Sequence, residues 1–93
     1  FAVKASGDSM VEAGIFDGDW VVVHKKEEAD PGEIIVARFD GEATIKRLMK
    51  DRLGWYLKPE NNAYPILRPA EENQLEIVGT VCALQRVMPF KSI

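Results

Sequence analysis

Residues 34–48 read IIVARFDGEATIKRL, and no other stretch of the chain indicates a structure as clearly. Two runs rich in β-branched and apolar residues, 34–39 and 42–48, are separated by Asp40-Gly41. An Asp-Gly pair between two such runs is typical of a β-hairpin, because a type I′ turn needs positive φ at both central residues. The stretch therefore predicts two antiparallel strands joined by a tight turn.

This hairpin predicts which residues face one another. With the Asp-Gly pair as the turn, Ala37 faces Thr44 and Ile35 faces Lys46. Because side chains alternate along a strand, Thr44 and Lys46 share a largely apolar face. Burial there disfavours the ammonium and lowers the pKa of Lys46, so that it can act as a general base near neutral pH. The alternative is that the Lys46 side chain reaches past its neighbours to water.

Outward from the hairpin, the pattern predicts further short strands and no sustained helix. Residues 59–69 contain three prolines and two asparagines and are expected to be mostly irregular. Residues 9–13 can form one helical turn that Gly14 ends. The sequence thus predicts a mainly β domain, with additional strands at residues 1–5, 20–24, 55–58 and 75–88.

Composition excludes several classes of protein. The 93 residues allow one domain, and 15 acidic against 12 basic residues give a net charge of -3, which argues against nucleic-acid binding by bulk charge. A single cysteine, Cys82, excludes an internal disulfide, and with the single histidine, His24, it leaves no zinc-type cluster. The apolar runs are too short to span a bilayer, and no signal peptide is evident. Because the chain begins with Phe1, we expect a fragment of a longer protein.

Ser9 is the candidate nucleophile. It follows Gly7-Asp8 where a strand gives way to a turn. Such a junction exposes a side chain and directs successive backbone N–H groups into one concavity, as an oxyanion hole requires. Serine also needs an adjacent base. The alternative is that Ser9 only caps the short helical turn, and His24, at a strand end, is expected to be a surface residue.

Six motifs in order carry a family resemblance. The chain resembles the C-terminal domains of LexA repressors and of their relatives, UmuD and the self-cleaving phage repressors, from Phe1 to about Val87. The motifs are SGDSM at 6–10, GIFDGD at 14–19, GEIIVA at 32–37, DGEATIKRL at 40–48, LKPEN at 57–61 and IVGTV at 77–81.

The resemblance implies a fold and a catalytic site. The fold is compact and mainly β, with the highly twisted antiparallel sheets of the LexA C-terminal and signal-peptidase-like fold and one short helical turn at the nucleophile. Residues 1–93 would form a single peptidase and dimerisation domain. Ser9 would be the nucleophile and neutral Lys46 the general base. The backbone N–H groups of Asp8 and Ser9 would hold the oxyanion. Thr44 would support Lys46, and no cofactor or metal is implied.

The resemblance also implies partners. Members of the family cut a peptide bond upstream in their own chain when the RecA–single-stranded-DNA filament stimulates them. The cleavage site and the N-terminal DNA-binding domain or arm are absent from these residues. We therefore expect no direct DNA binding by this fragment, no membrane association and a cytoplasmic location.

The last strand predicts a dimer. Strict alternation places Leu75, Ile77, Val81 and Ala83 on one face and Val78, Thr80, Cys82, Leu84 and Met88 on the other, so both faces are largely apolar. A loop covering the second face is one explanation. The resemblance implies another, a symmetric homodimer with Ile77 to Arg86 across the two-fold axis and Cys82 buried there.

Two alternative functions stay open at this point. One is a processed UmuD-like subunit that binds a translesion DNA polymerase and has no further enzymatic role. The other is a signal-peptidase-like enzyme that shares the serine–lysine chemistry but acts at membranes, for which these residues show no anchor.

Overall fold

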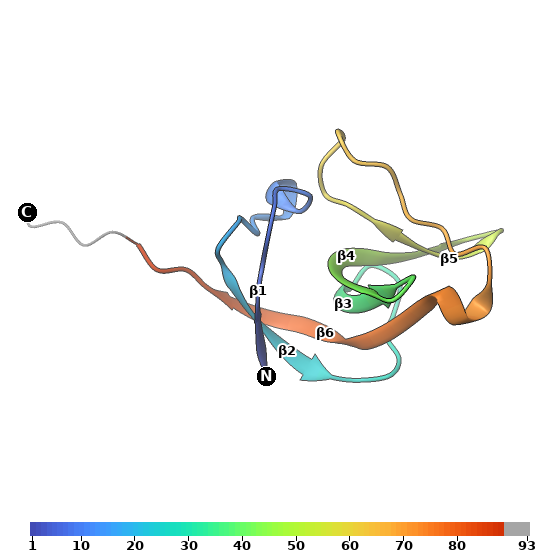
Figure 1. Cartoon of the computed structure of the whole chain (residues 1–93), viewed down its shortest axis with the longest axis horizontal. Coiled ribbons are helices and arrows are strands. Elements are labelled where there is room, and N and C mark those ends of the chain that lie inside the picture. The colour runs from blue at the N-terminus through green and yellow to red at the C-terminus, as the bar shows by residue number, and fades with distance from the viewer. Residues whose placement is uncertain (89–93) are drawn as a thin grey trace, which may run out of the picture.

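A computed structural model describes residues 1–88, which form a six-stranded antiparallel sheet in the order β1-β2-β6-β3-β4-β5 (Figure 1). Two single 3-10 turns, η1 (Val11–Ala13) and η2 (Glu72–Gln74), are the helical elements of the described chain. The prediction of a mainly β fold with one short helical turn after Ser9 is confirmed. The strands are β1 (Ala2–Lys4), β2 (Trp20–Lys25), β3 (Ile34–Phe39), β4 (Glu42–Asp51), β5 (Gly54–Lys58) and β6 (Leu75–Gln85).

The hairpin of β3 and β4 has the predicted turn and register. Asp40 and Gly41 have φ angles of 52° and 87°, the positive values that the turn requires. Ile35 pairs with Lys46 and Ala37 with Thr44, as predicted. Beyond the hairpin, β4 continues to Asp51 and pairs with β5.

β6 joins the two halves of the sheet. Its C-terminal part pairs with β2 and its N-terminal part with β3, and only Gly79 and Thr80 pair with both. In Figure 1, β1 and β2 lie on one side of this crossing and β3, β4 and β5 on the other. Alanine would not fit at Gly79, because its Cβ would lie 2.5 Å from the carbonyl oxygen of His24. The crossing therefore depends on a glycine for close backbone approach.

Two bulges in β6 overturn the predicted alternation of its faces. Val78 is the extra residue opposite β3, and Cys82 is the extra residue opposite β2. A bulge shifts the side-chain alternation of the residues beyond it. As a result, Val78 and Val81, which we placed on opposite faces, pack against the same core cluster. The strand also ends at Gln85 rather than at Met88.

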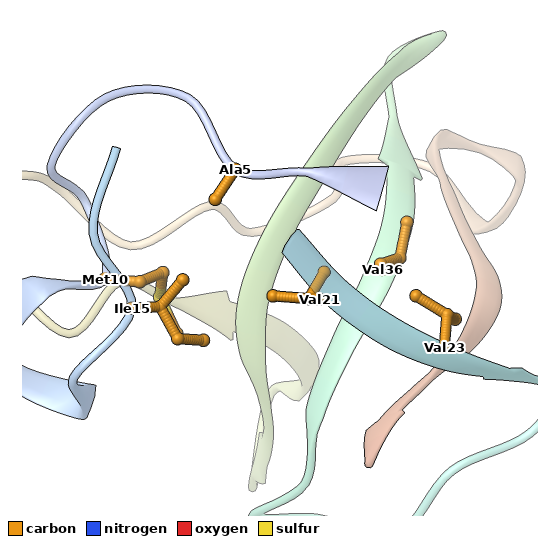
Figure 2. Close-up of a cluster of buried hydrophobic side chains, with 6 residues drawn as sticks. All are labelled: Ala5, Met10, Ile15, Val21, Val23 and Val36. Carbon is orange, nitrogen blue, oxygen red and sulfur yellow. The ribbon is translucent and has the colours of Figure 1, made fainter. Parts of the chain in front are cut away.

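The core has two parts, one on each side of β3. Neighbouring residues of a strand point to opposite faces, so Ile35 and Val36 belong to different clusters. The first cluster, drawn in Figure 2, includes Met10 and Ile15 from the segment between β1 and β2, and it anchors that segment to the sheet. The first cluster comprises Ala5, Met10, Ile15, Val21, Val23 and Val36, and the second Ile35, Ala37, Leu48 and Leu57.

Across residues 1–88 there is no helix whose length and hydropathy would suit a membrane span. Cys82, which we expected to be buried in a dimer, is exposed in the single chain, where the bulge places it. Residues 89–93 of the predicted domain lie outside the described part of the chain.

Candidate active site

A glycine-rich turn carries Ser9. Gly7 has a φ of 83°, and its N–H donates to Asp17 Oδ1 at 2.8 Å, which holds the turn against the loop that leads into β2. The next residues form η1, which ends at Gly14 in the left-handed conformation, as predicted. The N-cap of η1 is Met10, with no side-chain cap, so the alternative role of Ser9 as a helix cap is wrong. The Ser9 hydroxyl is left for another partner.

That partner is Lys46. Its Nζ lies 2.9 Å from Ser9 Oγ, although 37 residues separate the two in the sequence. Nζ also donates to Thr44 Oγ1 at 2.7 Å and to the carbonyl oxygen of Ile45 at 3.1 Å. The structure thus brings together three of the residues that the sequence singled out, Ser9, Thr44 and Lys46.

The surroundings of Lys46 favour its neutral form. The residue is only 8% exposed, and the alternative that it reaches past its neighbours to water is wrong. Burial lowers the pKa of the Lys46 ammonium from its usual value of 10.5. Among residues 1–88, none of the ion pairs involves Lys46, so no carboxylate offsets this desolvation. The lysine is therefore more readily deprotonated than an ordinary surface lysine.

Ser9 and Lys46 lie where two depressions meet. The first, about 190 Å³ in volume, separates residues 3–7 from residues 43–46. Met10 and Ile15 of the first core cluster contribute to its lining. Since β5 pairs with β4 only from Arg47 to Asp51, the outer edge of residues 43–46 is unpaired. The second depression, about 370 Å³, is bordered by Ser6, Gly7, Asp8, Tyr64, Pro65 and Leu67.

Comparisons with known proteins show the family of this chain. A family model described as Peptidase S24-like matches residues 1–82. The chain belongs to the Peptidase S24-like family. The LexA repressor of Bacillus cytotoxicus is 46% identical over 87 residues, which are 92% of this chain and 41% of that protein. The LexA repressor of Streptomyces avermitilis is 43% identical over 86 residues, which are 92% of this chain and 36% of that protein.

The resemblance to LexA repressors, first inferred from the motifs, is confirmed by these matches. This S24-like chain spans about two fifths of the length of the curated relatives that it matches. The match of the family model begins at Phe1 and includes both Ser9 and Lys46.

The backbone of the turn that carries Ser9 offers two N–H groups. Within residues 1–88, the amides of Asp8 and Ser9 donate to no protein acceptor, whereas the neighbouring Gly7 amide does. Amides without a partner beside a serine hydroxyl are available to an incoming oxygen. The Asp8 carboxylate itself accepts a hydrogen bond from the Tyr64 hydroxyl, so its side chain is engaged elsewhere.

Asp19 and Arg86 form an ion pair that holds the segment after Ser9, and sequence reasoning did not predict it. Asp19 is buried and accepts hydrogen bonds from the Phe16 N–H at 2.8 Å and from Arg86 at 2.7 Å. The Arg86 guanidinium and the Phe16 amide lower the pKa of Asp19 to about 2, so it stays ionised. Arg86 also donates to the Gly14 carbonyl oxygen at 2.9 Å and thus ties the end of β6 to the end of η1. No local signal in the sequence indicated the role of Arg86.

Sequence reasoning also missed Asn61 and Tyr64, which follow β5. Both contact Asp8, through its carbonyl oxygen and its carboxylate respectively. The available signal was the motif LKPEN at 57–61, which contributed to the resemblance without receiving a role. His24 is exposed on β2, as predicted.

Proposed function

We propose that this chain is the C-terminal peptidase and dimerisation domain of a LexA-type SOS-response repressor, which cleaves a peptide bond upstream in its own chain. The observation that carries the proposal is the 2.9 Å contact between Ser9 Oγ and a buried Lys46 Nζ. A serine beside a desolvated lysine is a recognised nucleophile–base pair. Membership of the Peptidase S24-like family and the similarity to LexA repressors support the same assignment.

In the proposed mechanism, neutral Lys46 takes the hydroxyl proton of Ser9 as Oγ attacks the scissile carbonyl carbon. The backbone N–H groups of Asp8 and Ser9 stabilise the oxyanion of the tetrahedral intermediate. The Lys46 ammonium then returns the proton to the leaving amine, and the C–N bond breaks to leave an acyl-Ser9. Lys46 next removes a proton from water as the water oxygen attacks this ester, and it returns the proton to Ser9 Oγ as the ester C–O bond breaks, which releases the acid product and restores the neutral amine.

Thr44 would hold the base in place. A neutral lysine amine has two N–H donors and one lone pair. Donation to Thr44 Oγ1 and to the Ile45 carbonyl oxygen uses both donors and leaves the lone pair for the Ser9 hydroxyl. The three contacts of Nζ therefore match the needs of the neutral base.

The substrate would be the chain's own upstream segment, bound in extended form between residues 3–7 and residues 43–46. The unpaired edge of β4 supplies backbone donors and acceptors of the kind that bind a peptide by strand addition. The apolar lining from Met10, Ile15 and Val36 favours a substrate with apolar side chains. Stimulation by the RecA–single-stranded-DNA filament and a cytoplasmic location complete the proposal.

The proposed homodimer would use the C-terminal part of β6, within Ile77 to Arg86. Apolar side chains remain exposed there and on the adjacent β2. Trp20 and Val22 share one face with Ala83, and Leu84 lies on the other face, opposite Val21. Exposed apolar side chains on neighbouring strands favour burial against a second copy of the same surface. Cys82 would lose its exposure in such a dimer.

The test is cleavage in trans. The chain is incubated with a peptide that carries an Ala-Gly bond between apolar residues, and fragments are quantified by mass spectrometry. We expect cleavage by the natural sequence and none by Ser9→Ala or Lys46→Ala, with circular dichroism spectra unchanged. Cleavage that persists in Ser9→Ala would refute the proposal, whereas a folded dimer without activity would instead support the non-enzymatic UmuD-like role.

A further inference from the structure

The loop that follows β5, residues 59–64, is fastened to the nucleophile turn. Five hydrogen bonds connect it to residues 8–12, and Figure 1 shows the two segments facing each other across the edge of the sheet. Three of the five run between backbone N–H groups and acceptors on the other segment, and two come from side chains of the loop. The bonds are Glu12 N–H to Glu60 O (2.9 Å), Glu60 N–H to Met10 Sδ (3.4 Å), Asn62 N–H to Glu12 Oε2 (3.2 Å), Asn61 Nδ2 to Asp8 O (2.8 Å) and Tyr64 Oη to Asp8 Oδ1.

The Asn61 side chain has a defined orientation in this loop. Its Oδ1 accepts a hydrogen bond from the Ala63 N–H at 2.9 Å, and its Nδ2 donates to the Asp8 carbonyl oxygen at 2.8 Å. The two ends of the amide thus meet groups of opposite polarity, and a flipped side chain would lose both bonds. Asn61 therefore presents a fixed donor to Asp8.

The carbonyl oxygen that Asn61 contacts belongs to the same peptide group as the Ser9 N–H. A peptide group is planar, so an anchored C=O also fixes the direction of the N–H on its other side. A donor on the carbonyl oxygen additionally polarises the amide and strengthens the N–H as a donor. A side chain that contacts no substrate can in this way act on an oxyanion-hole donor.

The loop is in turn connected to the strand of the base. Glu60 forms ion pairs with Arg47, the residue after Lys46, and with Lys58 at 3.6 Å. The Arg47 guanidinium and Lys58 ammonium lower the pKa of Glu60, so the carboxylate stays ionised. Asn61 thus acts from a loop that contacts both the nucleophile turn and β4.

We propose that Asn61 is a positioning residue of the peptidase, whose side-chain amide fixes and polarises the Asp8–Ser9 peptide group so that the Ser9 N–H stabilises the oxyanion. This inference rests on the proposed function of the site. It predicts a loss in the chemical step rather than in substrate binding or in the ionisation of Lys46.

The experiment compares Asn61→Ala and Asn61→Asp with the neighbouring control Asn62→Ala, whose replaced side chain makes no hydrogen bond within residues 1–88. The readouts are kcat and KM for the Ala-Gly peptide in trans, and the affinity for a peptide boronic acid. In the boronate adduct, Ser9 Oγ bonds to boron, its proton passes to Lys46, and a boron hydroxyl occupies the oxyanion position.

For Asn61→Ala we expect kcat and boronate affinity to fall together, by about tenfold. This loss is smaller than the 10²–10³ that follows removal of an oxyanion donor itself. KM and the midpoint of the pH profile should stay at their original values. Asn61→Asp should lose more, because an acceptor replaces the donor, and Asn62→Ala should match the natural sequence. Unchanged kcat in Asn61→Ala, or a loss accompanied by a shift in KM or in the pH midpoint, would overturn the inference.

A second measurement does not need activity. In ¹H–¹⁵N spectra of the chain, Asn61→Ala should move the Ser9 amide proton upfield and leave the Gly7 amide in place, since Gly7 donates to Asp17. An unmoved Ser9 amide would overturn the role of Asn61 even if the chain cleaves the peptide. Conversely, failure of Ser9→Ala to abolish cleavage would overturn the proposed function, while the amide shift would still report on the contact.

Discussion

Lys46 Nζ lies closer to Thr44 Oγ1, at 2.7 Å, than to the hydroxyl of Ser9, at 2.9 Å. Thr44 and Lys46 are two residues apart on β4, so their side chains leave the strand on the same face. The regular alternation of side chains along the strand is therefore enough to place Thr44 beside Lys46. A contact within β4 thus orients the Lys46 side chain independently of Ser9.

Thr44→Val tests this orientation. The substitution removes the acceptor on Nζ and puts a methyl group in its place, which destabilises the ammonium more than the neutral amine. The midpoint of the rate–pH profile should therefore move to lower pH, and the plateau rate should fall because the amine is less well held. Peptide cleavage in trans measures both quantities. Thr44→Ser keeps the hydroxyl and should stay close to the natural sequence, and a midpoint that moves upward in Thr44→Val would contradict the assignment.

The pH dependence of cleavage follows from the lowered pKa of Lys46. The neutral amine is the active form, so the rate should be low in acid and rise with pH along a single ionisation. The midpoint should lie below the usual lysine pKa of 10.5, because burial disfavours the ammonium. Initial rates across a buffer series give the profile. A rate that is independent of pH, or one that declines as the amine deprotonates, is incompatible with Lys46 as the base.

Lys46→Met should separate stability from activity. When the pKa of a lysine is lower in the folded state than in the unfolded state, the unfolded state binds the proton more tightly. Below the usual pKa of lysine, this preference reduces the free energy of unfolding. Methionine removes this cost, and we expect a gain in melting temperature that is largest near neutral pH. The gain should shrink as pH rises through the window between the folded and unfolded pKa values. Thermal melts at several pH values test this, and a stability difference between the two proteins that does not change with pH would argue against a desolvated lysine.

Gly79→Ala tests the crossing of β2, β6 and β3. A Cβ at this position would lie 2.5 Å from the His24 carbonyl oxygen and 2.6 Å from Val23 Cγ1, so the strands would have to separate. We expect a loss of about 2–3 kcal/mol in urea unfolding. Gly18→Ala is the matched control, because its Cβ would meet nothing within 4 Å and only its φ of 88° is unfavourable. Because an unfavourable φ alone costs roughly 1–2 kcal/mol, a loss in Gly79→Ala smaller than that in Gly18→Ala would argue against close approach at Gly79.

Leu84→Glu tests the proposed dimer. Leu84 is exposed near the end of β6, and a carboxylate there would be desolvated against a second copy. Sedimentation should report a dimer for the natural sequence and a monomer for Leu84→Glu. Leu53→Glu, at the turn between β4 and β5, should remain dimeric.

Cys82 supplies an independent readout of the same dimer. Because it is exposed in the single chain, its labelling rate should fall as protein concentration rises, and this dependence should vanish in Leu84→Glu. A natural chain that stays monomeric at about 100 μM would contradict a dimer of ordinary strength.

Local rules account for what the sequence predicted correctly. The Asp40-Gly41 turn and the alternation of strand residues sufficed for the register of β3 and β4, and hence for the burial of Lys46 beside Thr44. The pairing of Ser9 with Lys46 spans 37 residues, and only the family resemblance suggested it. Strand periodicity alone carries no information about such a distance.

The bulges of β6 and the long-range side-chain contacts could not be predicted, because no local sequence pattern indicates them. The predicted faces of β6 were wrong because of the bulges at Val78 and Cys82. One extra residue in a strand moves every side chain beyond it to the other face. The contacts of Arg86 with Asp19 and of Asn61 with Asp8 join segments 67 and 53 residues apart. Such contacts depend on the tertiary arrangement of the sheet and leave no local pattern in the sequence.

The arrangement of the sheet has a mechanical consequence for catalysis. Ser9 belongs to the half that contains β1 and β2, Lys46 belongs to the half that contains β3 and β4, and the only strand that the halves share is β6. The two halves are also held together by the first core cluster, in which Val36 packs with Met10 and Ile15, and by the loop 59–64. The 2.9 Å spacing of Ser9 Oγ and Lys46 Nζ therefore depends on how the two halves of the sheet are held together. We expect substitutions that loosen this connection to slow the proposed cleavage, although they alter none of the side chains that take part in it.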